Sequence, residues 1–157
     1  PFIARWPAQV RPGVATATVS QCDLLATCAA LLGVTLPQDA GEDSFSFLPV
    51  LTGTEDGRPR RTFTLQQDFR SGVSVRQGDW KYLDHPGSGG NRYENNPELK
   101  PFILPDTASG APGQLYNLDA DPGETKNLYL EQPQIVKELK TLLDQSKASG
   151  RSRTEHL

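Results

Sequence analysis

Three carboxylates lie close together in the string Asp119-Ala-Asp-Pro-Gly-Glu124. Carboxylate oxygens are the ligands that calcium prefers, so Asp119, Asp121 and Glu124 form a candidate calcium loop. An EF-type loop, however, needs a much longer run of oxygen ligands, with a glycine at its sixth position. Pro122-Gly123 is a typical turn dipeptide. We therefore predict a turn, with Glu124 either capping a short helical turn or meeting a nearby arginine or lysine.

Two cysteines, Cys22 and Cys28, offer thiol chemistry. Their spacing of six residues places them on different faces of a predicted helix and more than a turn apart, so they cannot bridge each other without unwinding it. A metal site on a helix would need ligands three or four residues apart, and no histidine or cysteine occupies those positions. We predict that both thiols are small buried hydrophobic groups.

Two cations, Arg76 and Lys81, alternate with apolar residues and could attract an anionic substrate. They could equally pair with Asp79, Asp84 or Glu124. Charged residues on a sheet face are usually solvated or paired, which favours the structural interpretation. A further cluster of arginines, Arg58, Arg60 and Arg61, is expected to form a solvated loop. The net charge of −3 gives no support to nucleic-acid binding.

The element that positions these groups is a predicted β-hairpin. Val73 and Val75 alternate with polar residues, Gly78-Asp79 supplies a two-residue turn, and Trp80 and Tyr82 share one face of the returning strand. Such aromatic side chains bury about 150–250 Å² each and can anchor a small sheet. Trp80 could instead be a platform for a sugar ring, but a role in the core is favoured.

Two amphipathic helices are predicted, the first packing on a core that belongs largely to the missing part of the protein and the last covering this sheet. Ser20 is a candidate N-cap with Asp23 three residues later, leucines follow at helical spacing, and Gly33 ends the helix. A second helix begins at Pro133 and carries a similar apolar stripe. The shorter elements are a strand at Phe2-Ile-Ala4, a helical turn within 44–52, an edge strand at 62–67, a long loop at 85–113 and a strand at 113–118.

The chain has 157 residues, with 14 glycines and 13 prolines that indicate many turns. No window approaches the 18 consecutive apolar residues of a membrane span. The sequence begins with Pro1 inside a predicted strand and contains no methionine. We therefore expect it to be an excised C-terminal piece of a longer protein.

Four strings, in order along almost the whole chain, resemble the C-terminal part of arylsulfatase-type, formylglycine-dependent sulfatases of the alkaline phosphatase superfamily. They are Pro1-Phe-Ile-Ala-Arg-Trp-Pro7, Ser20-Gln-Cys-Asp23, Val75-Arg-Gln-Gly-Asp-Trp-Lys-Tyr82, and Gln114-Leu-Tyr-Asn-Leu-Asp-Ala-Asp-Pro-Gly-Glu-Thr-Lys-Asn-Leu128. Each string alone is weak evidence, and the last two together are fairly specific. The residues that carry the motif are Arg76, Gly78, Trp80, Lys81, Leu115, Tyr116, Asp121, Pro122, Glu124 and Asn127.

The resemblance implies an α+β fold, in which an antiparallel sheet of about four strands packs against a C-terminal amphipathic helix. Residues 1–33 would be the last strand and helix of a larger catalytic α/β domain. Residues 34–60 would cross between the domains, and residues 61–157 would form the C-terminal subdomain. The missing catalytic domain is therefore the expected partner.

The resemblance also implies that no catalytic or metal-binding residue lies in this chain. The family's nucleophile occurs in a Cys/Ser-x-Pro-x-Arg string, which neither Cys22 nor Cys28 begins. The parent enzyme is expected to use a formylglycine and calcium, both held by the missing domain, to hydrolyse a sulfate ester on an aryl compound or a carbohydrate. The fragment alone is predicted to be inactive, with exposed apolar surface on the helix 20–32.

Loops of the family's small subdomain can reach the rim of the active cleft. On this basis Gln67, Asp68, Arg70 and His85 are candidate substrate-rim residues, although a surface role is the default for His85. The rival interpretations are a stand-alone carbohydrate- or protein-binding module and the C-terminal part of a related phosphodiesterase or phosphonate hydrolase. By analogy the parent would be periplasmic, secreted or lysosome-like.

Overall fold

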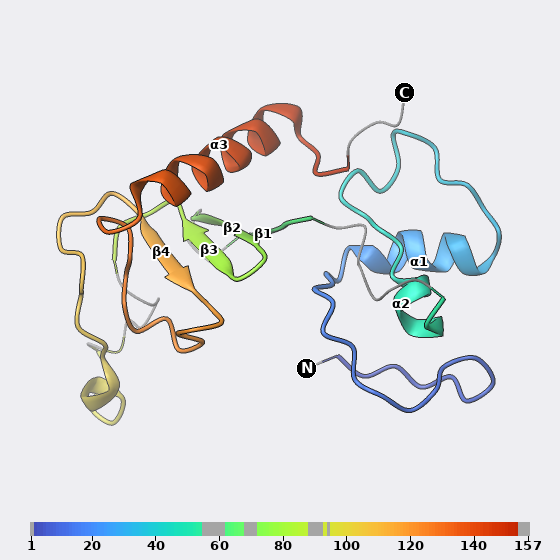
Figure 1. Cartoon of the computed structure of the whole chain (residues 1–157), viewed down its shortest axis with the longest axis horizontal. Helices are drawn as coiled ribbons and strands as arrows, with labels where there is room; N and C mark the ends of the chain where they lie inside the picture. Colours follow the sequence, from blue (N-terminus) through green and yellow to red (C-terminus); the bar gives the residue numbers. More distant parts are fainter. Residues whose placement is uncertain (1, 55–61, 68–71, 88–92, 94, 154–157) are drawn as a thin grey trace. The chain divides into compact units, whose positions relative to one another are not determined.

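A computed structural model describes residues 2–54, 62–67, 72–87, 93 and 95–153. The chain divides into two compact units. The helical unit comprises Pro1–Thr64 with Ser146–Leu157, and the sheet unit comprises Leu65–Gln145. The elements follow each other as two helices, three strands, a 3-10 turn, a fourth strand and a long final helix (Figure 1). The predicted arginine cluster at 58, 60 and 61 lies outside the described residues.

The sheet unit is built on four antiparallel strands in the order β1-β2-β3-β4. Their bounds are Thr64–Gln67, Val73–Gln77, Trp80–Leu83 and Gln114–Asn117. The predicted hairpin is confirmed, because Gln77 pairs with Trp80 across a turn in which Gly78 has a φ of 58°. A positive φ is what a two-residue hairpin turn requires of its first residue, and glycine adopts it without steric cost. The edge strand at 62–67 and the strand at 113–118 are confirmed as β1 and β4.

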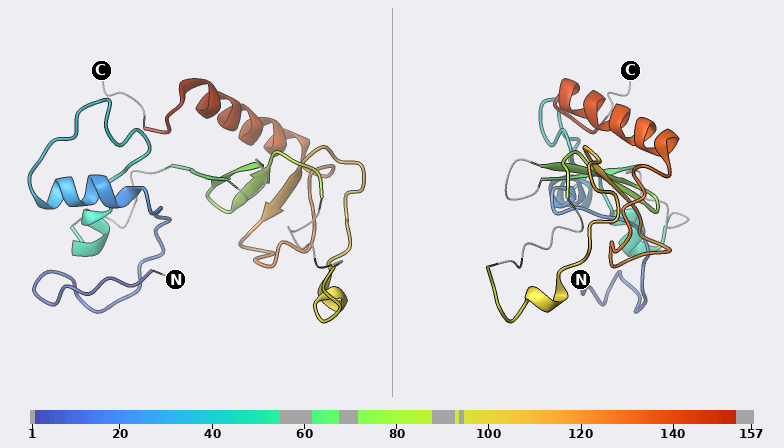
Figure 2. Two further views of the ribbon diagram at one scale, coloured as in Figure 1. Left: turned by 180° about the vertical axis from the view of Figure 1, so that it is seen from behind. Right: turned by 90° about the vertical axis from the view of Figure 1, so that its left-hand side faces the viewer.

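One face of the sheet forms the core together with α3 (Pro133–Ser149), which lies across it (Figures 1 and 2). Val75, Tyr82 and Leu115 are opposite one another in the strand pairing, and each is at most 2% exposed. The predicted stripe of α3 is confirmed, with its buried members at Val136, Leu139 and Leu143. Burial, followed by a hydrogen bond to Asp84, raises the pKa of the Tyr82 hydroxyl.

Trp80 differs from its predicted role in the core. It is only half-buried, and the residues paired with it on either side are the polar Gln77 and Asn117. Tyr82, one pair further along the strand, is the aromatic anchor of the sheet. A pattern of alternation places both aromatics on one face, but the neighbouring strands decide how much of each is covered.

The helical unit contains α1 (Asp23–Leu31) and α2 (Leu48–Thr52). The predicted helical turn within 44–52 is therefore confirmed as α2. The cap of α1 differs from the prediction, since the helix begins three residues after Ser20. Asp23 instead accepts a hydrogen bond from the Ser20 backbone N–H at 2.8 Å, which is one half of a capping box.

Two further predictions for the helical unit are wrong. Phe2-Ile-Ala4 forms no strand in the described part of the chain, because a strand needs a neighbour to accept its backbone hydrogen bonds and none lies beside it. Cys22 and Cys28 form no disulfide with each other, as their spacing predicts, but both are exposed and not buried. The buried side of α1 consists of Asp23, Thr27 and Ala29.

In its described part, the long loop at 85–113 contains the 3-10 turn η1 (Lys100–Phe102). The loop returns to the sheet at Gly113, where a Cβ atom would stand 2.9 Å from the Leu83 carbonyl oxygen and 2.9 Å from the Tyr129 ring. Glycine is therefore required at this close approach. No described helix combines the length and the apolar character that crossing a membrane demands.

Candidate functional site

Polar residues from distant parts of the chain come together at one end of the sheet, where β3 ends and β4 begins. Leu83 pairs with Gln114, so the register of β3 and β4 places His85 beside the start of β4. In an antiparallel sheet, the last residue of β1, Gln67, lies at this same end. Two strand spacings, about 10 Å, separate β1 from β3. The candidate rim residues Gln67 and His85 therefore share one end of the sheet.

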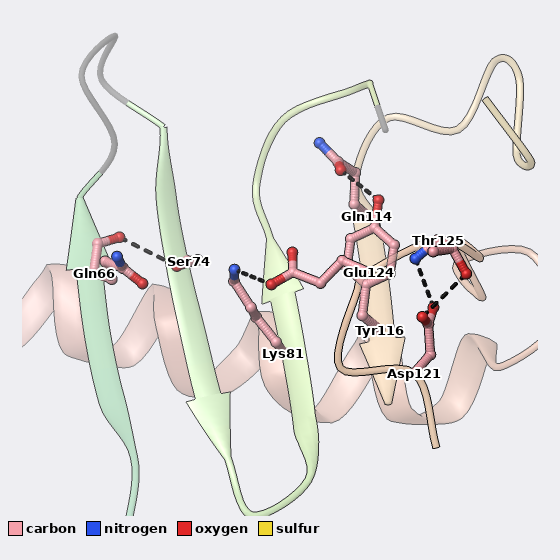
Figure 3. Close-up of polar contacts among 8 residues, drawn as sticks. All are labelled: Gln66, Ser74, Lys81, Gln114, Tyr116, Asp121, Glu124 and Thr125. Atoms are coloured by element: carbon pink, nitrogen blue, oxygen red, sulfur yellow. Dashed lines mark hydrogen bonds and ion pairs between the residues drawn. The ribbon is translucent and has the colours of Figure 1, made fainter. Parts of the chain in front are cut away.

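His85 is held in place by Gln114. The Gln114 Nε2 atom donates to the His85 carbonyl oxygen at 3.2 Å and lies 3.3 Å from the imidazole Nδ1. The Tyr116 hydroxyl donates to Gln114 Oε1 at 2.8 Å and so defines which way the amide points (Figure 3). Gln114 and Tyr116 are 1% and 0% exposed, whereas His85 is half-buried. A buried amide thus fixes a histidine at the edge of solvent.

The imidazole Nδ1 atom has two possible partners. Besides Gln114 Nε2, which is a donor, the Pro86 carbonyl oxygen lies 3.2 Å away and is an acceptor. The neutral ring can accept from the amide, and the Nδ1-protonated ring can donate to the carbonyl. The tautomer of the ring therefore decides which of these two groups it pairs with.

The other rim candidates contribute less. Gln67 is exposed at the end of the edge strand. Asp68 and Arg70 lie outside the described residues. Sequence reasoning missed Gln114, although one signal was available. A glutamine two positions before a tyrosine on a strand shares a face with it, and a buried amide in that position needs hydrogen-bond partners.

Lys81 is paired with a carboxylate. Its Nζ atom lies 2.7 Å from Glu124 Oε1, and the two side chains are 20% and 22% exposed (Figure 3). Of the alternatives for Glu124, the pairing with a nearby cation is therefore confirmed. Arg76 donates from Nε to the Gly78 carbonyl oxygen at 3.1 Å and supports the hairpin turn.

The predicted turn at 119–124 is confirmed. Asp121 accepts hydrogen bonds from the Thr125 N–H, the Thr125 hydroxyl and the Lys126 N–H, at 2.7 to 3.0 Å (Figure 3). The N–H of Lys126 is the leading cause that lowers the pKa of the Asp121 carboxyl. These oxygens serve backbone and side-chain donors of the same loop. Across the described residues, no group of three or more histidine, cysteine, aspartate or glutamate side chains could hold a metal ion.

Asn127 supports β4 from its outer edge. Its Oδ1 atom accepts from the Leu115 and Tyr129 N–H groups, each at 3.0 Å, and its Nδ2 atom donates to the Gly113 carbonyl oxygen at 3.3 Å. The side chain is 3% exposed. It thereby satisfies backbone groups of an edge strand that would otherwise be buried without partners.

Comparisons with known proteins agree on one kind of relative, although the chain matches no protein-family model. It is 37% identical over 94% of its length to an N-acetylgalactosamine-6-O-sulfatase of Bacteroides thetaiotaomicron. It is 34% identical over 82% of its length to human arylsulfatase A. The chain spans about a quarter of the length of these two relatives, 27% and 25% respectively.

Solved structures give the same picture. A structure from work on glycosaminoglycan metabolism by Bacteroides thetaiotaomicron matches 94% of this chain with a TM-score of 0.74 and 36% identity, over 29% of its own length. A 2-O glycosaminoglycan sulfatase matches 81% of the chain with a TM-score of 0.52 at 23% identity, which supports the fold alone.

Proposed function

The chain is a sulfatase homologue that corresponds to the C-terminal part of these enzymes, and on this premise we propose that it completes a sulfatase fold and shapes the rim of the substrate pocket. The observation that carries the proposal is the 37% identity over 94% of the chain to one sulfatase. The position of His85, held at an end of the sheet, supports the part of the proposal that concerns the rim.

For the whole enzyme we propose hydrolysis of a sulfate ester on a carbohydrate, with 6-O-sulfated N-acetylgalactosamine as the first candidate. The support is the name of the relative that this chain matches over most of its length at 37% identity. An aryl sulfate is the less favoured candidate, because the match to arylsulfatase A covers 82% of the chain at 34% identity.

The catalytic groups are proposed to lie outside this chain. A formylglycine would supply the nucleophile and calcium would stabilise charge on the sulfate oxygens. The described residues do not fit such a metal, because they contain no suitable group of ligands. We therefore assign no chemical step to this chain.

The task proposed for His85 is to position substrate. Its imidazole would line the rim and contact the sugar, while the Gln114–Tyr116 pair holds the ring and its backbone carbonyl in place. Gln67, Asp68 and Arg70 are proposed to line the same rim. Lys81 is not included, since Glu124 already neutralises its charge.

The proposed partner is the rest of the same protein. Four leucines of α1 and of its C-terminal end are 46% to 77% exposed, namely Leu24, Leu25, Leu31 and Leu32. This exposure agrees with the apolar surface predicted on the helix 20–32. Monomeric proteins rarely leave a contiguous apolar patch of several leucines in water. We propose that the catalytic domain covers this face.

The experiment compares two substrates in the full-length enzyme. His85→Ala should lower kcat/KM for 6-O-sulfated N-acetylgalactosamine by about 10- to 100-fold, roughly the cost of one polar contact to a charged group such as sulfate. A small aryl sulfate that does not reach the rim should lose less than threefold. The matched control is Lys126→Ala, which removes an exposed cation and should change neither rate. Equal loss on both substrates would contradict a role at the rim.

A further inference from the structure

The last described residues of the chain, after α3, return to the helical unit. The helix ends at Ser149, and Gly150 has a φ of 69° that turns the backbone out of the helix. The Ser149 hydroxyl donates to the Arg151 carbonyl oxygen at 2.8 Å and stabilises this turn. Residues 152 and 153 belong by their contacts to the same unit as α1.

Those two residues form a dense set of hydrogen bonds with the segment 37–43. The Ser152 N–H donates to Asp43 Oδ1 at 2.6 Å, and the Arg153 N–H donates to the Glu42 carbonyl oxygen at 2.9 Å. The Arg153 guanidinium donates through one nitrogen to the carbonyl oxygens of Pro37 at 3.1 Å and Ala40 at 2.9 Å. Most of the acceptors are backbone oxygens, so the contact depends on the path of the chain.

The continuation of the same segment is bound to α1. Ser44 Oγ accepts from the Ala26 N–H at 2.8 Å, and Asp23 Oδ1 accepts from the Phe45 N–H at 3.0 Å. Thr27 Oγ1 accepts from the Phe47 N–H at 3.1 Å. These side chains of α1 and of the segment are buried. The segment 37–47 is therefore held both by α1 and by the tail.

A cavity of about 830 Å³ lies at this junction. Its lining comes from α1, from the segment and from the tail, namely Ala26, Ala29, Ala30, Val34, Thr35, Leu36, Ser44, Phe45, Ser46 and Arg153. Arg153 thus contributes both to the hydrogen bonds and to the wall of the cavity. The tail lies more than 100 residues from the segment in sequence, with a separation of 109 for Ser152 and Asp43.

From these contacts we infer that residues 150–153 act as a strap, which holds segment 37–47 against α1 and maintains the wall of the cavity. The strap does not depend on the proposed substrate or on the enzyme's chemistry. Without it, the segment would keep its contacts with α1 and with Cys22 but would lose the hydrogen bonds to the tail. Local opening of the segment would then become more frequent, while the sheet unit would be unaffected.

Ser152 offers a matched pair of variants. Ser152→Pro removes the backbone N–H that donates to Asp43, whereas Ser152→Ala keeps it. Among the described residues the buried Ser152 hydroxyl has no hydrogen-bond partner, so its removal breaks no hydrogen bond there. Arg153→Ala removes the guanidinium and keeps the backbone bond to Glu42.

The test is hydrogen–deuterium exchange of the full-length protein, with peptides that cover 41–47 and the hairpin 73–83. Ser152→Pro should accelerate exchange in 41–47 by tenfold or more, Arg153→Ala by about threefold or more, and Ser152→Ala by less than twofold. The hairpin should be unchanged in all three variants. Unchanged exchange at 41–47 in Ser152→Pro and Arg153→Ala would overturn the strap. Equal acceleration in the hairpin would also overturn it, since the effect would then be global.

Discussion

The helices α1 and α3 carry apolar residues at the same spacing, yet the structure uses them in opposite ways. In α3, Leu139 and Leu143 are 2% and 0% exposed. In α1, Leu24 and Leu25 are 47% and 50% exposed, and the buried positions belong to Asp23, Thr27 and Ala29. The helix α3 has its partner within the chain, in the sheet that precedes it. The chain offers no equivalent partner to the leucines of α1 in its described part.

An apolar stripe on a helix therefore predicts that the stripe is buried, but it does not identify the surface that covers it. The sheet unit is a small core with its covering helix in place. The helical unit is organised by buried polar groups, such as Asp23, which bind backbone N–H groups of segment 43–47. The proposed catalytic domain would supply the missing apolar partner.

The largest expected effect comes from comparing a buried leucine of α3 with an exposed leucine at the end of α1. In the 157-residue chain, Leu143→Ala should lower the free energy of unfolding of the sheet unit by about 2–5 kcal/mol, because it empties a buried site. Leu32→Ala, at a side chain that is 77% exposed, should cost less than about 0.5 kcal/mol. Urea denaturation measures both. Equal costs would contradict the contrast between the two helices.

A second exposed leucine of α1 sharpens the comparison when the whole protein is used. If a catalytic domain covers α1, a leucine-to-alanine change on its exposed face should cost about 1–3 kcal/mol in the full-length enzyme. Leu24→Ala is the variant, and thermal unfolding of the fragment and the full-length protein is the measurement. A cost below about 0.5 kcal/mol in both would argue that this face stays in water.

A polar position of the sheet unit should show the next effect. Asn127→Ala leaves the Leu115 N–H and the Gly113 carbonyl without their partners at a buried site, so it should destabilise the sheet unit by about 1–3 kcal/mol. Asn96→Ala is the control, since its side chain bonds only exposed backbone groups. Chemical denaturation that shows equal effects for the two variants would contradict the role given to Asn127.

The ion pair should matter less. Glu124→Gln removes the charge opposite Lys81, and its cost should be about 1 kcal/mol or less because both side chains are partly solvated. Glu131→Gln, in the more exposed pair with Lys126, is the matched control and should cost less still. The cost of Glu124→Gln should be lower at high salt than at low salt, as measured by denaturation at the two salt concentrations. A salt-independent cost would show that packing, not charge, is the source.

The smallest effect concerns pH. Hydrogen bonds lower the pKa of Asp121 from 3.8, so its carboxylate favours the folded state above the unfolded pKa, and this contribution is lost as the pH falls through the lower folded pKa. Asp121 lies at the surface, so solvent screens the effect and it should be small. In Asp121→Asn, the fall in stability below about pH 4 should be slightly shallower than in the wild type. Identical acid-unfolding curves would show that the turn does not depend on this charge.

Much of the sheet unit could be predicted because its signals are local. Gly78-Asp79 specifies a tight turn, the alternation around it specifies two strands, and Pro133 marks the start of a helix. His85 was also predicted as a rim candidate. Gln114, which holds it, was not, because the two residues are 29 positions apart and meet only through the register of β3 and β4.

Local patterns were enough to predict the hairpin, the final helix, the turn around Asp121 and the resemblance to sulfatases, since each depends on neighbouring residues or on strings of them. Three outcomes needed the folded chain: Trp80 is half-buried, both cysteines are exposed, and Lys81 pairs with Glu124 and not with Asp79 or Asp84. The folded chain also decided that Ser152 binds Asp43. These outcomes depend on which distant segments meet, and that is set by the packing of the whole unit and by no local pattern.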